Sequence, residues 1–517
     1  MRRCLRAATV LWLAGVAALP AGETQSSSAP ASFPAVASTA WASLPEHTPA
    51  TTAPSSIPAP GPAPATGVAA ESAPADARAA DDRRLNIVLI TAADLPLHLT
   101  GLGPRPTART PRLEALAARG ATFSRCYTPT PQAAPAQASL LTGLYPPVHG
   151  VLADRQPAGP DTDAFTARLS RAGYACTFVG RWALAGGEPG RPGFGLDGAA
   201  VIEPAGLTWM NCPAYVRGTR GPSEGHLTDW LTDRAVEAVR APAGRPFFLW
   251  VAYPAPALPA EPPPGAEGLY PADSLDLPAD TAGQPHERKG NLAQHPSAEA
   301  FRDAGEAGLR AARSAYLAMI THLDGCMGRL LDALEAAGGG RDTAVIFAAE
   351  SGICLGERGL LGKGPFFYDD MIRVPLILVA PGVPPGRRVD RVVSLVDVAP
   401  TILAVAGAPP PARICGRSLL GPAANPDASW PDESFLACEE SSTPNRPPLR
   451  QQVRGLVTRQ YKLIDYTGLG PMVFALHRDP AESFSVTEIA QYAQVVQVLQ
   501  ARLTRWRGEI KDTGPRR

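Results

Sequence analysis

The fold of this chain is decided by the stretch Leu85-Asn86-Ile87-Val88-Leu89-Ile90-Thr91. Nearly all of its side chains are apolar or β-branched, as is typical of a strand buried on both faces of a sheet. Runs of the same kind recur along the chain, and we predict further buried strands at residues 174–179, 247–252, 344–348 and 376–379.

Helical patterns lie between these strands. Residues 111–118 start with a proline, which suits the first turn of a helix, and residues 227–239 form a second predicted helix. From residue 309 to 336 the apolar side chains fall three or four apart, which indicates one long amphipathic helix. Strands that alternate with helices predict an α/β domain, residues 83–425, with a mostly parallel central sheet flanked by helices.

The pattern changes after residue 425. Short strand candidates at residues 452–458, 461–465 and 472–475 are separated by turn residues, and a helical pattern covers 486–506. We therefore predict a small C-terminal subdomain, residues 426–517, with an antiparallel sheet and a closing helix.

Two segments precede the first strand. Residues 1–21 combine early arginines, a short apolar run and small residues, which is typical of a secretory signal peptide. The apolar run is shorter than the roughly 20 residues that a membrane span needs, so no transmembrane segment is expected. Residues 22–82 are rich in Ala, Pro, Ser and Thr, which predicts a disordered tether. The expected location is secreted or periplasmic.

Charge and cysteine usage exclude some functions. Lys+Arg and Asp+Glu number 48 each, which gives no reason to expect nucleic acid or an anionic membrane as a partner. Beyond Cys4 there are seven widely spaced cysteines and no CxxC pair, so the cysteine pattern does not predict a zinc site. One or two disulfides are compatible with export, and the sequence does not assign them.

A second stretch, Ala133-Ala134-Pro135-Ala136-Gln137-Ala138-Ser139-Leu140-Leu141-Thr142-Gly143, bears on function. It resembles the signature of the sulfatase family, within the alkaline phosphatase superfamily. In that family a Cys or Ser, followed by x-Pro-x-Arg, precedes Ala-Ser-Leu-Leu-Thr-Gly. Other segments resemble the family in order, namely residues 89–96, 110–120, 145–150, 231–235, 246–249, 362–364, 372–376 and 396–401.

The resemblance implies that the reactive group is missing. In the family the Cys or Ser is oxidised to formylglycine, whose hydrate is the nucleophile. Here Ala133 stands at that position and Gln137 stands at the motif arginine. A methyl group cannot be oxidised to the aldehyde or attack sulfur, so the family mechanism is unavailable.

The resemblance also implies a depleted metal site. Family members hold a hard cation, usually calcium, with an Asp-Asp pair after the first strand and an Asp-Asn or Asp-His pair after a later one. The matching positions here are Ala93-Asp94 and Glu350-Ser351. Calcium affinity follows the number and charge of the oxygen ligands, so binding at Asp94, Glu350 and Ser351 should be weak or lost.

The remaining family positions concern the anion. Two of the family's histidine positions are Ala183 and Ala257, while Arg181 and Lys363 match basic positions and are candidate anion contacts. A guanidinium holds an anion but does not transfer protons. The resemblance thus favours an inactive pseudo-sulfatase that binds a sulfated glycan, a small sulfate ester or another anionic ligand.

The sequence leaves two alternatives open. The first is an active sulfuric or phosphoric ester hydrolase with a rearranged mechanism, for which Thr128, Thr130 and Ser139 are the nearest hydroxyls. They are out of register with the nucleophile position, so metal-activated water is the better candidate. The second alternative is a structural protein whose tether presents a folded head.

Overall fold

The computed structural model describes most of the chain after the tether. The described residues are 84–104, 107–154, 156–159, 161–186, 188–203, 207–240, 245–278, 295–338, 343–440 and 451–512. The predicted signal peptide, residues 1–21, and the predicted tether, residues 22–82, lie outside them.

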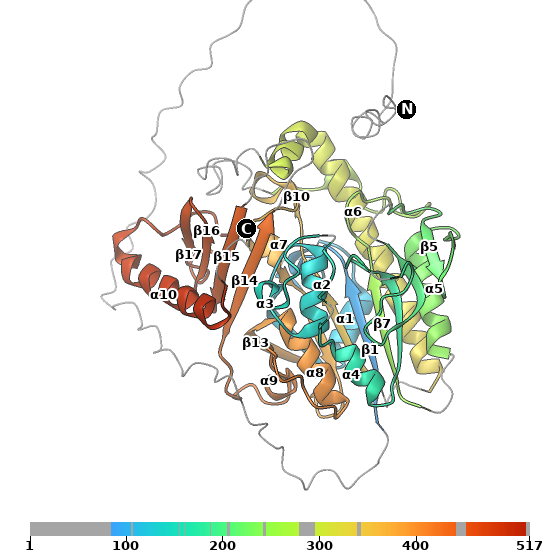
Figure 1. The fold of residues 1–517 in the computed structure, drawn as a ribbon. Helices are drawn as coiled ribbons and strands as arrows, with labels where there is room; N and C mark the ends of the chain where they lie inside the picture. The colour runs from blue at the N-terminus through green and yellow to red at the C-terminus, as the bar shows by residue number, and fades with distance from the viewer. Residues whose placement is uncertain are drawn as a thin grey trace, which may run out of the picture. The chain divides into compact units, whose positions relative to one another are not determined.

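Five strands pair in parallel at the centre of an eleven-stranded sheet (Figure 1). Their order is β8-β1-β7-β3-β4, and their bounds are β1 Asn86–Ala92, β3 Ala175–Arg181, β4 Asp197–Ile202, β7 Phe247–Tyr253 and β8 Thr343–Ala349. The predicted strands at 85–91, 174–179, 247–252 and 344–348 are therefore confirmed. Both neighbours of β1 come from much later in the chain, and β1 lies between them in the interior of the sheet.

The outer strands of this sheet run antiparallel in part, so that the sheet as a whole is mixed. On one side β12 pairs antiparallel with β8 and β2, while β13 pairs in parallel with β2. On the other side β5 and β6 form an antiparallel hairpin beside β4. The bounds are β2 Ala121–Tyr127, β5 Pro213–Val216, β6 Thr219–Pro222, β11 Arg373–Val374, β12 Leu376–Val379 and β13 Arg387–Ser394.

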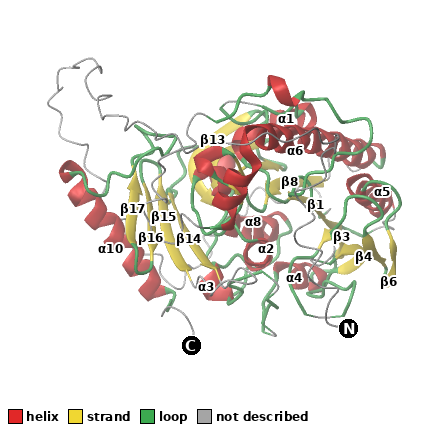
Figure 2. Cartoon of the chain, turned by 90° about the horizontal axis from the view of Figure 1, so that it is seen from above, coloured by secondary structure: helices red, strands yellow, loops and turns green. Residues whose placement is uncertain are grey.

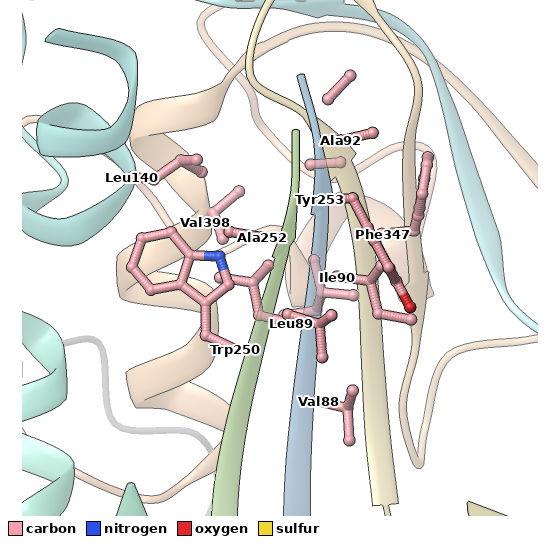
Figure 3. Close-up of a cluster of buried hydrophobic side chains, with 14 of the residues drawn as sticks. Val88, Leu89, Ile90, Ala92, Leu140, Trp250, Ala252, Tyr253, Phe347 and Val398 are labelled. Carbon is pink, nitrogen blue, oxygen red and sulfur yellow. The ribbon is translucent and has the colours of Figure 1, made fainter. Parts of the chain in front are cut away.

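Helices cover both faces of the sheet (Figure 2). Trp250 points to one face, toward Leu140 of α2 and Val398 of α8 (Figure 3). Tyr253 points to the opposite face, where its hydroxyl lies 3.0 Å from Thr232 Oγ1 of α5. Helices α1, α5 and α6 lie on this second face. The bounds are α1 Pro111–Ala118, α2 Ala133–Thr142, α4 Phe165–Arg171, α5 Leu227–Arg240, α6 Pro296–Ala336 and α8 Val398–Val405.

Helix α6 begins earlier than its apolar stripe predicted. The stripe from residue 309 onward is helical as expected, but the helix is extended back to Pro296, with a break at Gly305. Gly305 has φ 58° and ψ −176°, outside the helical region. Shorter elements complete the domain, with bounds α3 Pro146–His149, β9 Cys354–Leu355, β10 Leu361–Gly362, α7 Asp369–Ile372 and α9 Leu420–Ala424.

The C-terminal part is a four-stranded antiparallel sheet with a closing helix, as predicted (Figure 2). Its bounds are β14 Glu433–Glu440, β15 Gln451–Thr458, β16 Lys462–Tyr466, β17 Gly470–Phe474 and α10 Ala493–Glu509. Helix α10 starts later than the predicted residue 486. The fully buried Lys462 fastens this sheet to the α/β domain, because its ammonium lies 2.5 Å from both Asp369 of α7 and Glu482.

Among the described residues, the seven cysteines that follow the tether are not joined by disulfides. Six of the seven are buried. Among the same residues, no helix has both the length and the apolar character needed to cross a membrane.

Candidate functional site

The polar residues singled out from the sequence gather at the carboxyl ends of the parallel strands. Asp94 follows β1, Arg181 ends β3, and Glu350 follows β8. Because β8, β1, β7 and β3 are neighbours and point the same way, their ends share one edge of the sheet. This edge is where open α/β sheets generally bind ligands.

An ammonium group and a hydroxyl group both donate hydrogen bonds to Asp94. Its Oδ1 accepts a hydrogen bond from Lys363 Nζ at 2.7 Å and another from Ser351 Oγ at 2.8 Å. The backbone of Asp94 has φ 58°, a left-handed conformation that aspartate tolerates better than most residues. The hydroxyl of Tyr316, on α6, donates to the Asp94 carbonyl oxygen and fixes this turn.

Glu350 is almost fully buried beside this group. Its Oε1 accepts from Thr91 Oγ1 at 3.2 Å, and Thr91 in turn accepts from the Trp250 indole at 3.1 Å. Burial raises the pKa of Glu350 to about 7, with the Asp94 charge adding to the rise, while Arg181 and the Thr91 hydrogen bond oppose it. The carboxyl therefore changes charge near neutral pH.

Gln137 joins three elements at the motif arginine position. It is fully buried on α2, and its Oε1 accepts the backbone N–H of Ala183 at 2.7 Å. Its Nε2 donates to the carbonyl of Arg181 at 3.1 Å and approaches Glu350 Oε1 at 3.4 Å. The neutral amide of Gln137 therefore forms hydrogen bonds to the backbone at the motif arginine position. It supplies no positive charge that would attract an anion.

Among the residues that the structure describes, Arg181 is the cation that pairs with Glu350. Its Nη2 lies 3.8 Å from Glu350 Oε2, which is an ion pair without a hydrogen bond. Among the described residues this buried Nη2 has no hydrogen-bond partner. Gly180 makes the approach of β3 to β7 possible here, since a Cβ at that position would stand 2.1 Å from the Ala252 oxygen.

Ala133, at the nucleophile position implied by the resemblance, is the first residue of α2 and is partly buried. The next amide, that of Ala134, donates to Asp154 Oδ1 at 2.9 Å. Asp154 is therefore the carboxylate that caps this helix, where the helix dipole attracts negative charge. It follows that the start of α2 carries no reactive group and is already paired with an anion of the chain itself.

The nearby hydroxyls do not replace the nucleophile. Thr128, Thr130 and Ser139 are fully buried, and Thr128 Oγ1 is committed to the Thr130 carbonyl at 2.8 Å. Ser139 Oγ lies 3.0 Å from His149 Nε2, while His149 Nδ1 accepts the amide of Val151 at 3.1 Å. Because Nδ1 is an acceptor, the neutral ring carries its proton on Nε2 and cannot take one from Ser139.

The two alanines at the histidine positions differ in what surrounds them. Ala183 is buried and is linked to the site through its amide bond with Gln137. Ala257 is buried in the turn after β7, where its amide donates to the Pro254 carbonyl at 3.1 Å. Neither side chain can carry a proton, so the described edge of the sheet lacks a histidine acid or base at both positions.

The charges at this edge balance without a metal ion. Two carboxyl groups, of Asp94 and Glu350, face two cations, Lys363 and Arg181. Calcium sites use six to eight oxygens with several carboxylates, and here the Asp94 oxygen is already engaged by an ammonium. The residues therefore do not fit a tight calcium site.

Several residues at the site carry no local sequence signal. Thr91 and Tyr316 act through partners more than 200 residues away in the chain, and Asp154 caps a helix that starts 21 residues before it. Thr91 was visible as the end of the first strand, but its bond to Glu350 depends on β1 and β8 being neighbours.

Comparison with sequence families gives two matches. The model of the family described as Sulfatase matches residues 85–408, and a model described as "N-sulphoglucosamine sulphohydrolase, C-terminal" matches residues 356–509. Among curated relatives, the chain is 27% identical over 492 residues to the "Multifunctional alkaline phosphatase superfamily protein PehA" of Trinickia caryophylli, covering 82% of this chain and 95% of that protein. It is 29% identical over 360 residues to the choline-sulfatase of Rhizobium meliloti, covering 62% and 67%.

Solved structures share the fold. One is a protein in complex with its substrate D-glucosamine-2-N,6-O-disulfate, with a TM-score of 0.73 and 21% identity, covering 84% of this chain and 99% of that one. Another is the phosphonate monoester hydrolase of Silicibacter pomeroyi, with a TM-score of 0.72 and 23% identity, covering 82% and 96%. At these identities the likeness establishes the fold alone.

Proposed function

The chain belongs to the sulfatase family, and from that membership we propose that it is a non-catalytic member that binds a sulfated or other anionic ligand at the carboxyl edge of its central sheet. The observation that carries the proposal is Ala133, a methyl group where the family has its formylglycine precursor, at the start of α2. Gln137, Ala183 and Ala257 remove the motif arginine and both histidines. Catalytic groups that act as a unit fail together, so no partial version of the family mechanism remains.

Arg181 supports the anion-binding part of the proposal. Its buried Nη2 has no hydrogen-bond partner among the residues the structure describes, and an unpaired buried donor is costly unless a ligand satisfies it. When Glu350 takes up a proton, the balance of charge at the edge shifts to one excess positive charge. The ligand class, a sulfated glycan or a small sulfate ester, follows from the family membership.

Turnover measurements test the non-catalytic part. We expect no hydrolysis of 4-nitrophenyl sulfate, 4-nitrophenyl phosphate or a phenylphosphonate ester by the purified full chain. Hydrolysis that is lost in the double variant Arg181→Gln, Lys363→Gln would overturn the proposal and favour an active ester hydrolase that uses water. Activity that persists in the double variant and co-purifies with the chain would also overturn the non-catalytic proposal.

Calorimetric titration tests the binding part, with inorganic sulfate and glucosamine 6-sulfate as probes. We expect Arg181→Gln to weaken binding at least tenfold, which corresponds to about 1.4 kcal/mol. The matched control is Arg191→Gln, an exposed arginine paired with Glu188 on the surface. Equal affinities of the wild type and Arg181→Gln would show that this arginine is not the anion contact.

We also propose that the chain is exported. The predicted signal peptide and tether support this, and two curated relatives are named extracellular sulfatases, from Caenorhabditis elegans and Drosophila melanogaster. Secretion of a fusion of residues 1–82 to a reporter, compared with a fusion lacking residues 1–21, tests the proposal. Equal retention of both fusions inside the cell would contradict it.

A further inference from the structure

A cluster of side chains of the metal-ligating types lies between α5 and α6, outside the site described above. It consists of His226, just before α5, Asp229 on α5, and His322 and Cys326 on α6. One ligand atom from each of His226, Asp229 and His322 falls within 4.8 Å of the others. Cys326 adds a thiol that is almost fully buried.

The atoms of three of these residues converge on one point. His322 Nε2 lies 3.0 Å from Asp229 Oδ2 and 3.6 Å from Cys326 Sγ, and Cys326 Sγ lies 3.5 Å from Asp229 Oδ1. In a tetrahedral zinc site with usual bond lengths, the ligand atoms are about 3.4–3.6 Å apart. His322, Asp229 and Cys326 therefore have nearly the spacing that zinc requires, and a nitrogen of His226 lies within 4.8 Å of the ligand atoms of Asp229 and His322.

Helix geometry explains why the residues meet. His322 and Cys326 are four residues apart on α6, so that both side chains project from the same face of that helix. His226 and Asp229 are three residues apart at the start of α5, which packs against α6. Two imidazoles, a carboxylate and a thiol are a ligand set suited to zinc and related borderline-soft divalent ions.

Two contacts compete with a metal ion. Arg329 Nη2 lies 2.8 Å from Asp229 Oδ1 and 3.6 Å from Cys326 Sγ, but its side chain is 47% exposed and can move into solvent. The nitrogens of His226 lie 3.1 Å from the Glu261 oxygen and 3.3 Å from the Thr228 amide. Ligation through Nδ1 gives up the bond from the Thr228 amide and keeps the donation from Nε2 to the Glu261 carbonyl, a backbone contact of the kind that orients metal-bound histidines.

We propose that His226, Asp229, His322 and Cys326 form a zinc-binding site that ties the start of α5 to the middle of α6. The site is independent of the anion-binding edge and of the family chemistry. Binding replaces the thiol proton of Cys326 and the proton on the ligating nitrogen of His322, which are released to solvent as the metal enters.

Cobalt binding by the purified, chelator-treated full chain tests the proposal under reducing conditions. We expect one Co²⁺ per chain with a thiolate-to-cobalt charge-transfer absorption, and we expect Zn²⁺ to displace the cobalt and abolish that absorption. Cys326→Ser should remove the band. The matched control is Cys176→Ser, a buried thiol on β3 that should leave the band unchanged.

Two further variants make the test independent of the folding of Cys326→Ser. His322→Gln should weaken zinc binding by more than about 100-fold, beyond what loss of an outer-shell partner produces. Arg329→Gln should tighten it, because it removes the competing cation. Failure to bind cobalt stoichiometrically, or a band that persists in Cys326→Ser, would overturn the proposal and leave the cluster as a network of ion pairs.

Discussion

Lys363 Nζ lies 2.7 Å from Oδ1 of Asp94, on the same oxygen that accepts from Ser351. In the sulfatase pattern, that aspartate belongs to the metal site and the lysine to the anion contact. Here they are partners of each other. The positive charge that a hard cation would supply to this carboxylate comes from the chain.

This pairing predicts how calcium binding responds to mutation. The wild type should bind Ca²⁺ with a Kd above about 1 mM, because few charged oxygens are free. Lys363→Gln should tighten binding at least tenfold, about 1.4 kcal/mol, since it removes a cation from the ligand oxygen. Calorimetry measures both, with the exposed Lys511→Gln as control. Tight binding by the wild type would contradict our account of the site.

Glu350 predicts a pH dependence of stability. Its pKa rises from an ordinary value of 4.5 to about 7 on folding, so its contribution is complete below pH 4.5 and is lost as pH rises through 7. Between pH 5 and 8 the unfolding free energy of the wild type should decrease, and in Glu350→Gln this decrease should be smaller by about 1–3 kcal/mol. Urea unfolding across this range measures it.

The control for this prediction is Glu335→Gln, an exposed carboxylate paired with Arg119. Burial also raises the pKa of Asp397 and of Glu482 to about 7, so the wild-type slope has several sources. Only the difference between Glu350→Gln and the wild type isolates Glu350. Identical slopes for the two proteins would show that the Glu350 pKa is unchanged by folding.

We expect a substitution of Gln137, at the motif arginine position of the sulfatase pattern, to lower the stability of the protein. Gln137→Ala leaves the Ala183 amide and the Arg181 carbonyl without their partner and opens a cavity, so we expect a loss of about 2–4 kcal/mol of stability. Denaturant unfolding measures this. Gln497→Ala, on the exposed face of α10, should stay within about 0.5 kcal/mol. If Gln137→Ala also loses no more than about 0.5 kcal/mol, the hydrogen bonds of the Gln137 amide do not stabilise the fold.

The ion pairs of Lys462 should couple the unfolding of the C-terminal sheet to that of the α/β domain. Lys462→Met leaves Asp369 and Glu482 buried without their shared cation, and removal of one member of a buried ion pair typically costs about 3–5 kcal/mol. The unfolding transition should also become less cooperative. Lys511→Met, near the C-terminus, serves as control. An unchanged transition would show that the two parts are joined by apolar packing instead.

Much of the fold could be predicted from the sequence, because buried strands have a strong local signal. The parallel strands at residues 85–91, 174–179, 247–252 and 344–348 are continuous apolar runs. The strand Ala121–Tyr127 was missed because Thr122, Ser124 and Arg125 interrupt its apolar pattern. Pairing, and therefore the mixed character of the sheet, depends on contacts between distant segments.

The two sites were harder to predict from the sequence than the fold. Family motifs identified Asp94, Glu350, Arg181 and Lys363, but not which of them pair with one another. The cluster around His322 contains no CxxC pair, so the cysteine pattern does not predict it. The usable signal was a histidine and a cysteine four residues apart in a predicted helix, and its completion by residues of α5 requires the packed helices.

The central place of β1 also has a consequence for biosynthesis. Its hydrogen-bonding partners are β7, which ends at Tyr253, and β8, which begins at Thr343. Among the described strands, the first to leave the ribosome therefore keeps one edge unpaired while more than half of the α/β domain is being made. Such non-local pairing delays folding until late in synthesis. A nascent chain that stops before residue 343 lacks strand β8, one of the two strands that pair with β1.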